Sequence, residues 1–179
     1  MSLLNSQKQV VGNSRLARLS LLVALGLILF MFESFIPRPL PWLKPGLAHV
    51  ATLLAMYLLG NRSAIMVVVL RVFIGSLLLG TLLNPAFILA LGGSLSATLV
   101  MGLVRHYLSR VFSIFGISII GALVHNLTQL FLVQMILVRR TEIYYLAPFM
   151  MLTSLVTGFI VALVAWLLLS RTAPSITGS

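Results

Sequence analysis

Apolar residues fill six long runs along the chain, and short polar or proline-containing stretches separate them. The pattern predicts six membrane-spanning helices, over about residues 16–36, 46–59, 64–83, 85–104, 111–138 and 144–169. We therefore expect an all-α fold, with residues 1–179 forming one polytopic membrane domain built as a bundle of six transmembrane helices.

Prolines mark several of these boundaries. The stretch PRPLPWLKPG follows the first run, Pro45 precedes the second, and Asn84-Pro85 separates the third from the fourth. The second run is short for a hydrocarbon core of about 30 Å, so a partly re-entrant segment is the alternative there. The polar tails, about residues 1–13 and 172–179, are expected to be mobile.

Composition assigns the chain to the membrane. Of its 179 residues, 60% are hydrophobic and 8% charged, and a soluble domain of this size could not bury that much apolar surface. The net charge of +10 comes from twelve Lys and Arg against two acids. Most of these cations flank apolar runs, which indicates contact with anionic membrane lipid and not with nucleic acid. With no cysteine, the chain forms no disulfide and no thiolate metal site.

The cations also predict an orientation. Seven fall on one side of the six spans and four on the other: Lys8, Arg15, Arg18, Arg62, Arg105, Arg110 and Arg171 against Arg38, Lys44, Arg139 and Arg140. The excess places both termini in the cytoplasm of a bacterium, with the protein in the cytoplasmic membrane. The first run has a basic start like a signal peptide, but it is too long and has no A-x-A site, so we expect it to be retained.

Pairs of small residues recur at helical spacing, which favours close helix packing. The pairs are Ala51 and Ala55, Gly93 and Ala97, Ser94 and Thr98, Ser118 and Ala122, and Ser154 and Gly158.

One charge, Arg71, lies within an apolar run near mid-membrane, where an arginine costs about 2.5–3.5 kcal/mol. It should face the bundle interior, and Gly75 on the same face allows a helix or a ligand to approach. Of the two acids, Glu142 lies in an outer loop, whereas Glu33 lies near the outer end of the first span. Two alternatives follow: a structural Glu33–Arg71 pair, or a site where Arg71 binds an anionic ligand group with Glu33 nearby.

The run GISIIGALVHNLTQLF carries a polar stripe. Ser118, Ala122, His125 and Gln129 share one helical face, with Asn126 at its edge. The stripe predicts either hydrogen bonds between helices or the wall of a pocket that binds the polar end of a substrate. Because the three histidines occupy different segments, we expect no metal site.

The outer loop after the first span is the third candidate feature. It is stiffened by prolines and contains Arg38, Trp42 and Lys44, and His49 and Thr52 follow on one face of the second span. The loop is either an interfacial anchor or a rigid cover over an outward-facing pocket whose cations attract an anionic ligand.

Several kinds of chemistry lack their motifs. The chain has no phosphate-binding G-x-x-x-x-G-K-[ST] loop, no dinucleotide fingerprint and no aspartate with which to hold Mg²⁺ at a diphosphate. We expect no cofactor and no catalytic activity of its own.

Three blocks carry a family resemblance: FESFIPRPLPWLKPGLAHVATLLAMYLLG, LRVFIGSLLLGTLLNPAFILALGGSLSA and GISIIGALVHNLTQL. They resemble the Gx transporter family, also called heptaprenyl diphosphate synthase component I, over about residues 16–168. The transporter name implies similarity to the S components of energy-coupling factor importers, six-helix proteins that use two ATPase subunits and a coupling membrane subunit. Their short alanine motif on the first helix is not clear here; Ala17, Ala24 and Gly26 are the candidates.

The resemblance leaves three roles open. The first is a transport or binding subunit for a small anionic or amphipathic molecule related to isoprenoids, quinones or flavins. Its substrate-binding candidates are Arg71, Glu33, His125, Asn126, Gln129, His49, Lys44 and Trp42. The second is an accessory membrane subunit of heptaprenyl diphosphate synthesis, and the third is a partner in a quinone- or flavin-linked redox system.

Overall fold

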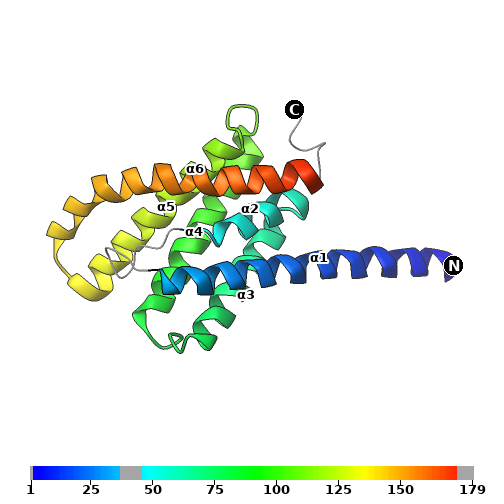
Figure 1. The fold of residues 1–179 in the computed structure, drawn as a ribbon, viewed down its shortest axis with the longest axis horizontal. Coiled ribbons are helices and arrows are strands. Elements are labelled where there is room, and N and C mark those ends of the chain that lie inside the picture. The colour runs from blue at the N-terminus through cyan, green and yellow to red at the C-terminus, as the bar shows by residue number, and fades with distance from the viewer. Residues whose placement is uncertain (1, 37–45, 173–179) are drawn as a thin grey trace.

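The computed structural model describes residues 2–36 and 46–172, with side chains from residue 13 onward, and its regular elements there are all helices. The α-helices are α1 (Ser2–Phe35), α2 (His49–Leu58), α3 (Asn61–Leu78), α4 (Pro85–Leu108), α5 (Ile114–Val133) and α6 (Ala147–Thr172). A π-helical turn (Gln134–Val138) and a 3-10 helix (Thr141–Leu146) connect α5 to α6. The prediction of an all-α, six-helix fold is confirmed (Figure 1).

Among the described residues, five helices are long and apolar enough to cross a membrane, and α2 is shorter. With 10 residues, α2 covers about 15 Å, or half of a hydrocarbon core. The helix occupies His49–Leu58 of the predicted run 46–59. Gly46 and Gly60, whose φ angles of 78° and 94° do not fit a helix, lie on either side of it.

Neighbouring contacts fix the direction of each helix. The helices α1 and α3 run parallel, because Gly26 packs on Arg71 and, one turn later, Phe30 packs on Gly75. The chain between them therefore returns to the end of the bundle where α1 enters it, and α2 lies on that return path. The pairs α3–α4, α4–α5 and α5–α6 are antiparallel.

This path brings together, at one end of the bundle, the described members of the seven cations that were predicted to lie on the cytoplasmic side. The start of α3, the end of α4 and the end of α6 meet there, so Arg62, Arg105 and Arg171 share that end, and Arg139 and Arg140 lie at the other. We refer to the first as the basic end. The directions of the helices therefore separate the cations into the same two groups from which the orientation was predicted.

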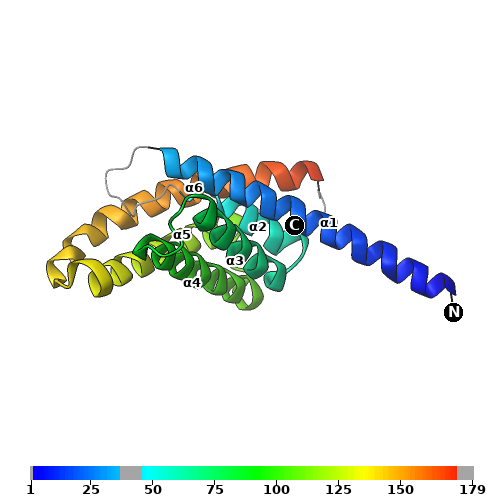
Figure 2. The same ribbon diagram turned by 90° about the horizontal axis from the view of Figure 1, so that it is seen from below.

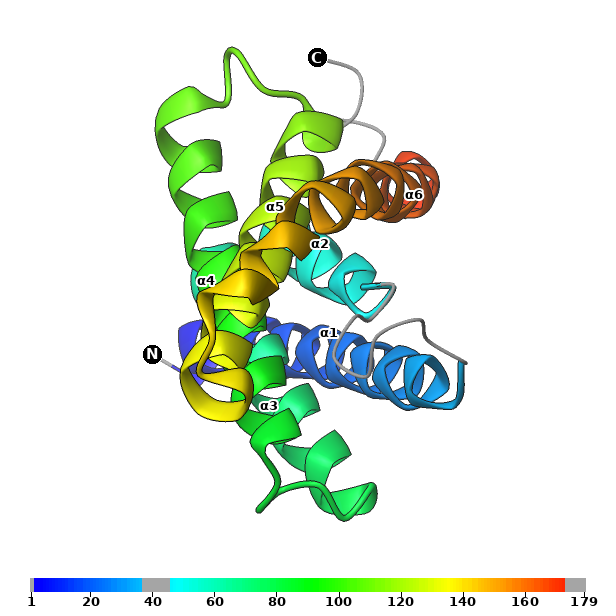
Figure 3. The ribbon, with the colours of Figure 1, turned by 90° about the vertical axis from the view of Figure 1, so that its left-hand side faces the viewer.

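The short α2 closes the bundle. It packs against α1, α3 and α6, and Figure 3 shows it between α1 and α6. Every residue of α2 from His49 to Met56 is buried.

The N-terminal turns of α1 project beyond the other helices (Figures 1 and 2). Residues 2–13, predicted as a polar tail, belong to α1, which continues through Gly12. Residues 173–179 of the predicted C-terminal tail lie outside the described part of the chain.

Local signals set the boundary between α3 and α4. Helix α3 ends at Leu78 and not at the predicted 83, because Gly80 adopts a φ of 66° in a Schellman motif. There the N–H of Thr81 donates to the carbonyl of Ser76 at 2.8 Å. The next helix begins as predicted at Pro85, where the Asn84 side chain accepts from the N–H of Ala86 at 3.2 Å.

The predicted small-residue pairs lie at helix contacts. Ala51, Ala55 and Ala97 are fully buried in the largest apolar cluster. Between α5 and α6, the Ser118 hydroxyl donates to the carbonyl of Gly158 at 2.8 Å.

Gly158→Ala is expected to destabilise the bundle. An added Cβ at Gly158 would lie 2.8 Å from the Cα of Ile119, and backbone cannot move aside as a side chain can. We expect the free energy of unfolding, measured by denaturation in detergent, to fall by about 1–3 kcal/mol. Gly92→Ala is the matched control, because its Cβ would meet only the mobile end of Leu132. Equal effects of the two substitutions would contradict the close α5–α6 approach.

Candidate functional site

Arg71 is held inside the bundle by three helices. Its side chain is 1% exposed, and Nη2 donates to the hydroxyl of Ser94 in α4 at 3.4 Å. Gly26 of α1 gives it room, because a Cβ there would lie 3.1 Å from Arg71 Cδ. Gly75, predicted to admit a helix or a ligand, faces the ring of Phe30, so α1 makes that approach.

Glu33 lies in α1 near Arg71. Its carboxylate is 2% exposed and accepts from the backbone N–H of Ala48 at 3.1 Å, just before α2 begins. It also acts electrostatically on the Arg71 guanidinium and stabilises its positive charge. The structure thus places the two residues close together, as the sequence suggested.

The two charged side chains line one partly open space between the helices, which we name the charged cavity. It has a volume of about 10 Å³, roughly the room that one water molecule needs, and side chains of five helices meet around it. Its polar lining consists of Glu33, His49, Arg71, Ser94, His125 and Gln129, and its apolar lining includes Phe30 and Ala90. Four of the predicted binding residues therefore surround Arg71.

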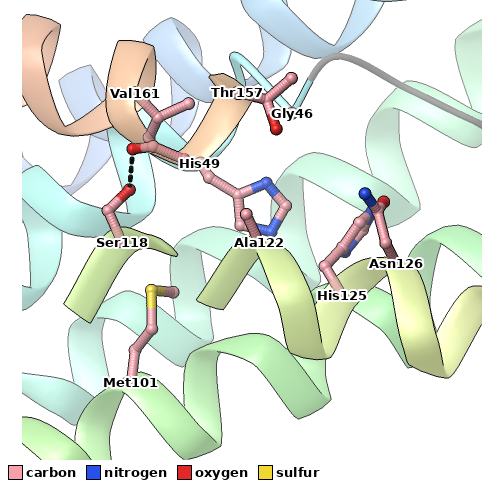
Figure 4. A pocket seen from close by; sticks show the side chains of 10 residues that line it. Gly46, His49, Met101, Ser118, Ala122, His125, Asn126, Thr157 and Val161 are labelled. Carbon is pink, nitrogen blue, oxygen red and sulfur yellow. Dashed lines mark hydrogen bonds between the residues drawn. The ribbon is translucent and has the colours of Figure 1, made fainter. Parts of the chain in front are cut away.

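A second cavity, of about 20 Å³, adjoins the first, and we name it the neutral cavity. Both cavities are lined by Gly46, His49 and His125. Figure 4 shows His49, Ser118 and Asn126 around the neutral cavity, with α5 forming one of its walls. The rest of its lining is mostly apolar and includes Met101 and Val161.

His49 and His125 contact each other across the boundary of the two cavities. Their ring centroids are 4.7 Å apart, and the rings are nearly perpendicular at 77°. The two histidines lie on separate segments of the sequence, and no pattern in the sequence indicated this contact. It depends on the position that α2 takes among the other helices. Within the described residues, no three histidine or acidic side chains gather as a metal site would require.

Asn126 has a structural role as well as a place in the lining. Its Nδ2 donates to Ser154 Oγ at 2.7 Å, and so ties α5 to α6. Of the predicted polar stripe, Ser118 and Asn126 thus bond to α6, whereas His125 and Gln129 face the charged cavity.

A family comparison covers this whole site. The family described as heptaprenyl diphosphate synthase component I matches residues 22–168. The chain belongs to this family. Its description, component I, names one part of a system with several components. No curated protein and no solved structure matches the chain.

Three buried polar atoms, on residues that line the charged cavity, have no hydrogen-bond partner within the described part of the chain. They are Nε2 of His49, Nε of Arg71 and Oε1 of Gln129. A buried polar atom left unsatisfied costs about 1–3 kcal/mol. Such atoms are available to hydrogen-bond with a molecule that reaches them.

Some predicted residues lie outside the described part of the chain, and some residues of the cavities were not predicted. Trp42 and Lys44 lie outside the described residues, as does Arg38. Ser94 was noted only as a small residue for helix packing, yet it bonds to Arg71. Phe30, Ala90, Thr157 and Val161 also line the cavities, and no sequence signal distinguishes them from other apolar or small residues.

Proposed function

We propose that the protein is the substrate-binding subunit of a membrane transport system and takes up a small anionic or amphipathic molecule. The observation that carries the proposal is Arg71: a buried arginine with an unpartnered Nε, on a cavity that five helices surround. An arginine kept in the middle of a membrane helix despite its cost is a functional candidate.

The lining suggests how a ligand would bind. Arg71 would hold an anionic or hydrogen-bonding group, with Glu33 beside it to moderate the positive charge. His49 Nε2 and Gln129 Oε1 would pair with further polar atoms. The apolar walls of the neutral cavity, which has a volume of about 20 Å³, would move apart to enclose the remainder, as in sites that combine a few placed polar groups with a hydrophobic lining. An isoprenoid-, quinone- or flavin-related molecule has this combination of polar and apolar parts.

Transport in this proposal depends on partner proteins, because the chain has no ATP-binding motif. The likeness to S components suggests two ATPase subunits and a coupling membrane subunit, with the protein in a bacterial cytoplasmic membrane and both termini in the cytoplasm. Of the residues considered for the docking motif, Gly26 packs on Arg71 and Ala51, while Ala17 and Ala24 are exposed on α1. These two alanines are therefore the candidates for contact with the coupling subunit.

The family description favours a second candidate, an accessory membrane subunit of heptaprenyl diphosphate synthesis. Since the chain contains no aspartate, a separate, aspartate-rich subunit would have to supply the chemistry. This candidate predicts contacts with that subunit at the basic end, where Arg62 and Arg110 are exposed.

Copurification from the native membrane in mild detergent separates the two candidates. We expect the tagged protein to bring down two ATPases and a membrane subunit, each absent from a control preparation of the untagged protein. Recovery of a soluble prenyl diphosphate synthase without ATPases would contradict the transport proposal and support the accessory role.

A further inference from the structure

A third cavity lies at the basic end, away from the charged cavity. It has a volume of about 300 Å³ and opens among the end of α2, the connection between α4 and α5, and the end of α6. Its lining includes Tyr57, Arg105, Phe112, Phe115, Trp166 and Leu169. We name it the end cavity. The proposed transport function places its ligand in the charged and neutral cavities and assigns no role to the end cavity.

Arg105 is the charged group of the end cavity, and its guanidinium is fixed in place. Nη1 donates to the backbone carbonyl of Met56, and the group lies over the Tyr57 ring with Cζ 4.5 Å from the centroid. A guanidinium has five N–H donors in a planar fork. Those not directed at Met56 remain to bind an anion, and a fork of this kind suits the oxygens of a phosphate.

The surrounding charges favour an anion as well. Arg62, Arg110 and Arg171 are exposed at the same end of the bundle. The chain has two acids in total: Glu33 lines the charged cavity, and Glu142 lies in the 3-10 helix at the opposite end. The first residues of α5 line the end cavity too, and its N-cap, Ser113, makes no side-chain cap hydrogen bond. The positive end of that helix dipole adds to the attraction.

The rest of the lining is aromatic or apolar. Phe112 lies in the turn before α5, and Phe115 lies in the first turn of α5. Trp166 and Leu169 come from the end of α6. An inorganic ion would leave these surfaces unused, whereas an apolar chain would bury them.

We propose that the end cavity binds an amphiphile with a phosphate head group. Arg105 holds the phosphate, and Phe112, Phe115 and Trp166 contact the apolar chain. Two sources supply this chemistry: a free prenyl diphosphate, and an anionic phospholipid of the surrounding leaflet. The proposal is independent of the charged cavity and stands or falls separately from transport.

Trp166 provides a direct reporter. The chain has two tryptophans, so Trp42→Phe leaves Trp166 as the single one, in contact with the end cavity. Farnesyl diphosphate is titrated into this variant in dodecyl maltoside micelles, whose head group contains no phosphate, and phosphatidylglycerol is introduced in a parallel series. Farnesol, which has the chain without the phosphate, is the head-group control.

We expect a saturable change in Trp166 fluorescence with at least one phosphate-bearing probe, and binding about tenfold or more weaker with farnesol. Arg105→Gln should weaken binding of the phosphate-bearing probe by a similar factor, and Arg105→Lys by less. Arg62→Gln, the same charge change at an exposed cation outside the cavity, should leave binding unchanged. A response to farnesyl diphosphate alone identifies the free diphosphate as the source, and an equal or stronger response to phosphatidylglycerol identifies the leaflet lipid.

Ser113→Phe keeps the test valid if Arg105→Gln fails to fold. This substitution narrows the end cavity without changing charge or removing a cap hydrogen bond, and we expect it to weaken the saturable change about tenfold or more. The proposal is overturned if neither phosphate-bearing probe gives saturation, if farnesol binds as well as farnesyl diphosphate, or if folded Ser113→Phe binds like the parent.

Discussion

Glu33→Gln should lower the free energy of unfolding by about 1–3 kcal/mol, because it removes the negative charge that stabilises the nearby, buried Arg71 guanidinium. The glutamine can still accept the N–H of Ala48, so the substitution removes the charge and keeps that hydrogen bond. What is lost is the electrostatic support of Arg71, which is 1% exposed. Denaturation with sodium dodecyl sulfate, in otherwise identical micelles, would measure the loss.

The chain offers a matched control, because Glu142 is its second acid and is exposed. Glu142→Gln should change the free energy of unfolding by less than about 0.5 kcal/mol. The double variant Glu33→Gln/Arg71→Met should recover most of the stability lost in the single variant, since no charge then remains unpaired there. Similar values for Glu33→Gln and Glu142→Gln would show that Arg71 does not depend on Glu33.

Gln129→Met should separate stability from ligand binding. Methionine has nearly the shape of glutamine, and the substitution removes an amide whose Oε1 is buried without a partner. The free energy of unfolding without ligand should therefore stay the same or rise by about 1 kcal/mol. The amount of small molecule that copurifies with the protein, released and quantified by mass spectrometry, should fall about tenfold or more.

Asn126→Leu is the contrasting variant, because Asn126 already bonds to Ser154 at 2.7 Å. It should lower stability directly by leaving α5 less firmly attached to α6. If Gln129→Met also destabilises the protein and retains the copurifying molecule, the polar lining of the charged cavity serves folding and not binding.

The sequence predicted the helices well where local signals determine them. Asn84-Pro85 begins α4 in the structure because the cap and the proline act within a single turn. The run around Arg71 also indicated its own environment, since a charge in lipid must face inward and the chain has only two acids that could balance it.

The features that escaped prediction depend on helices far apart in the sequence. His49 and His125 lie in α2 and α5, and their contact follows from the position of α2 between α1 and α6. The contact between Ser94 and Arg71 depends likewise on the register of α4 against α3. No periodicity within one run encodes such a register.

The short, enclosed α2 also bears on how the protein is made. A helix of 10 residues offers the insertion machinery about half the apolar length that a nascent segment needs to partition into lipid by itself. Since α1, α3 and α6 surround it, α2 must become stable in the bilayer only when its neighbours have arrived. Because α6 follows the other described helices along the chain and lines the neutral cavity, the final shape of that cavity is reached only after α6 has been synthesised, well after α2.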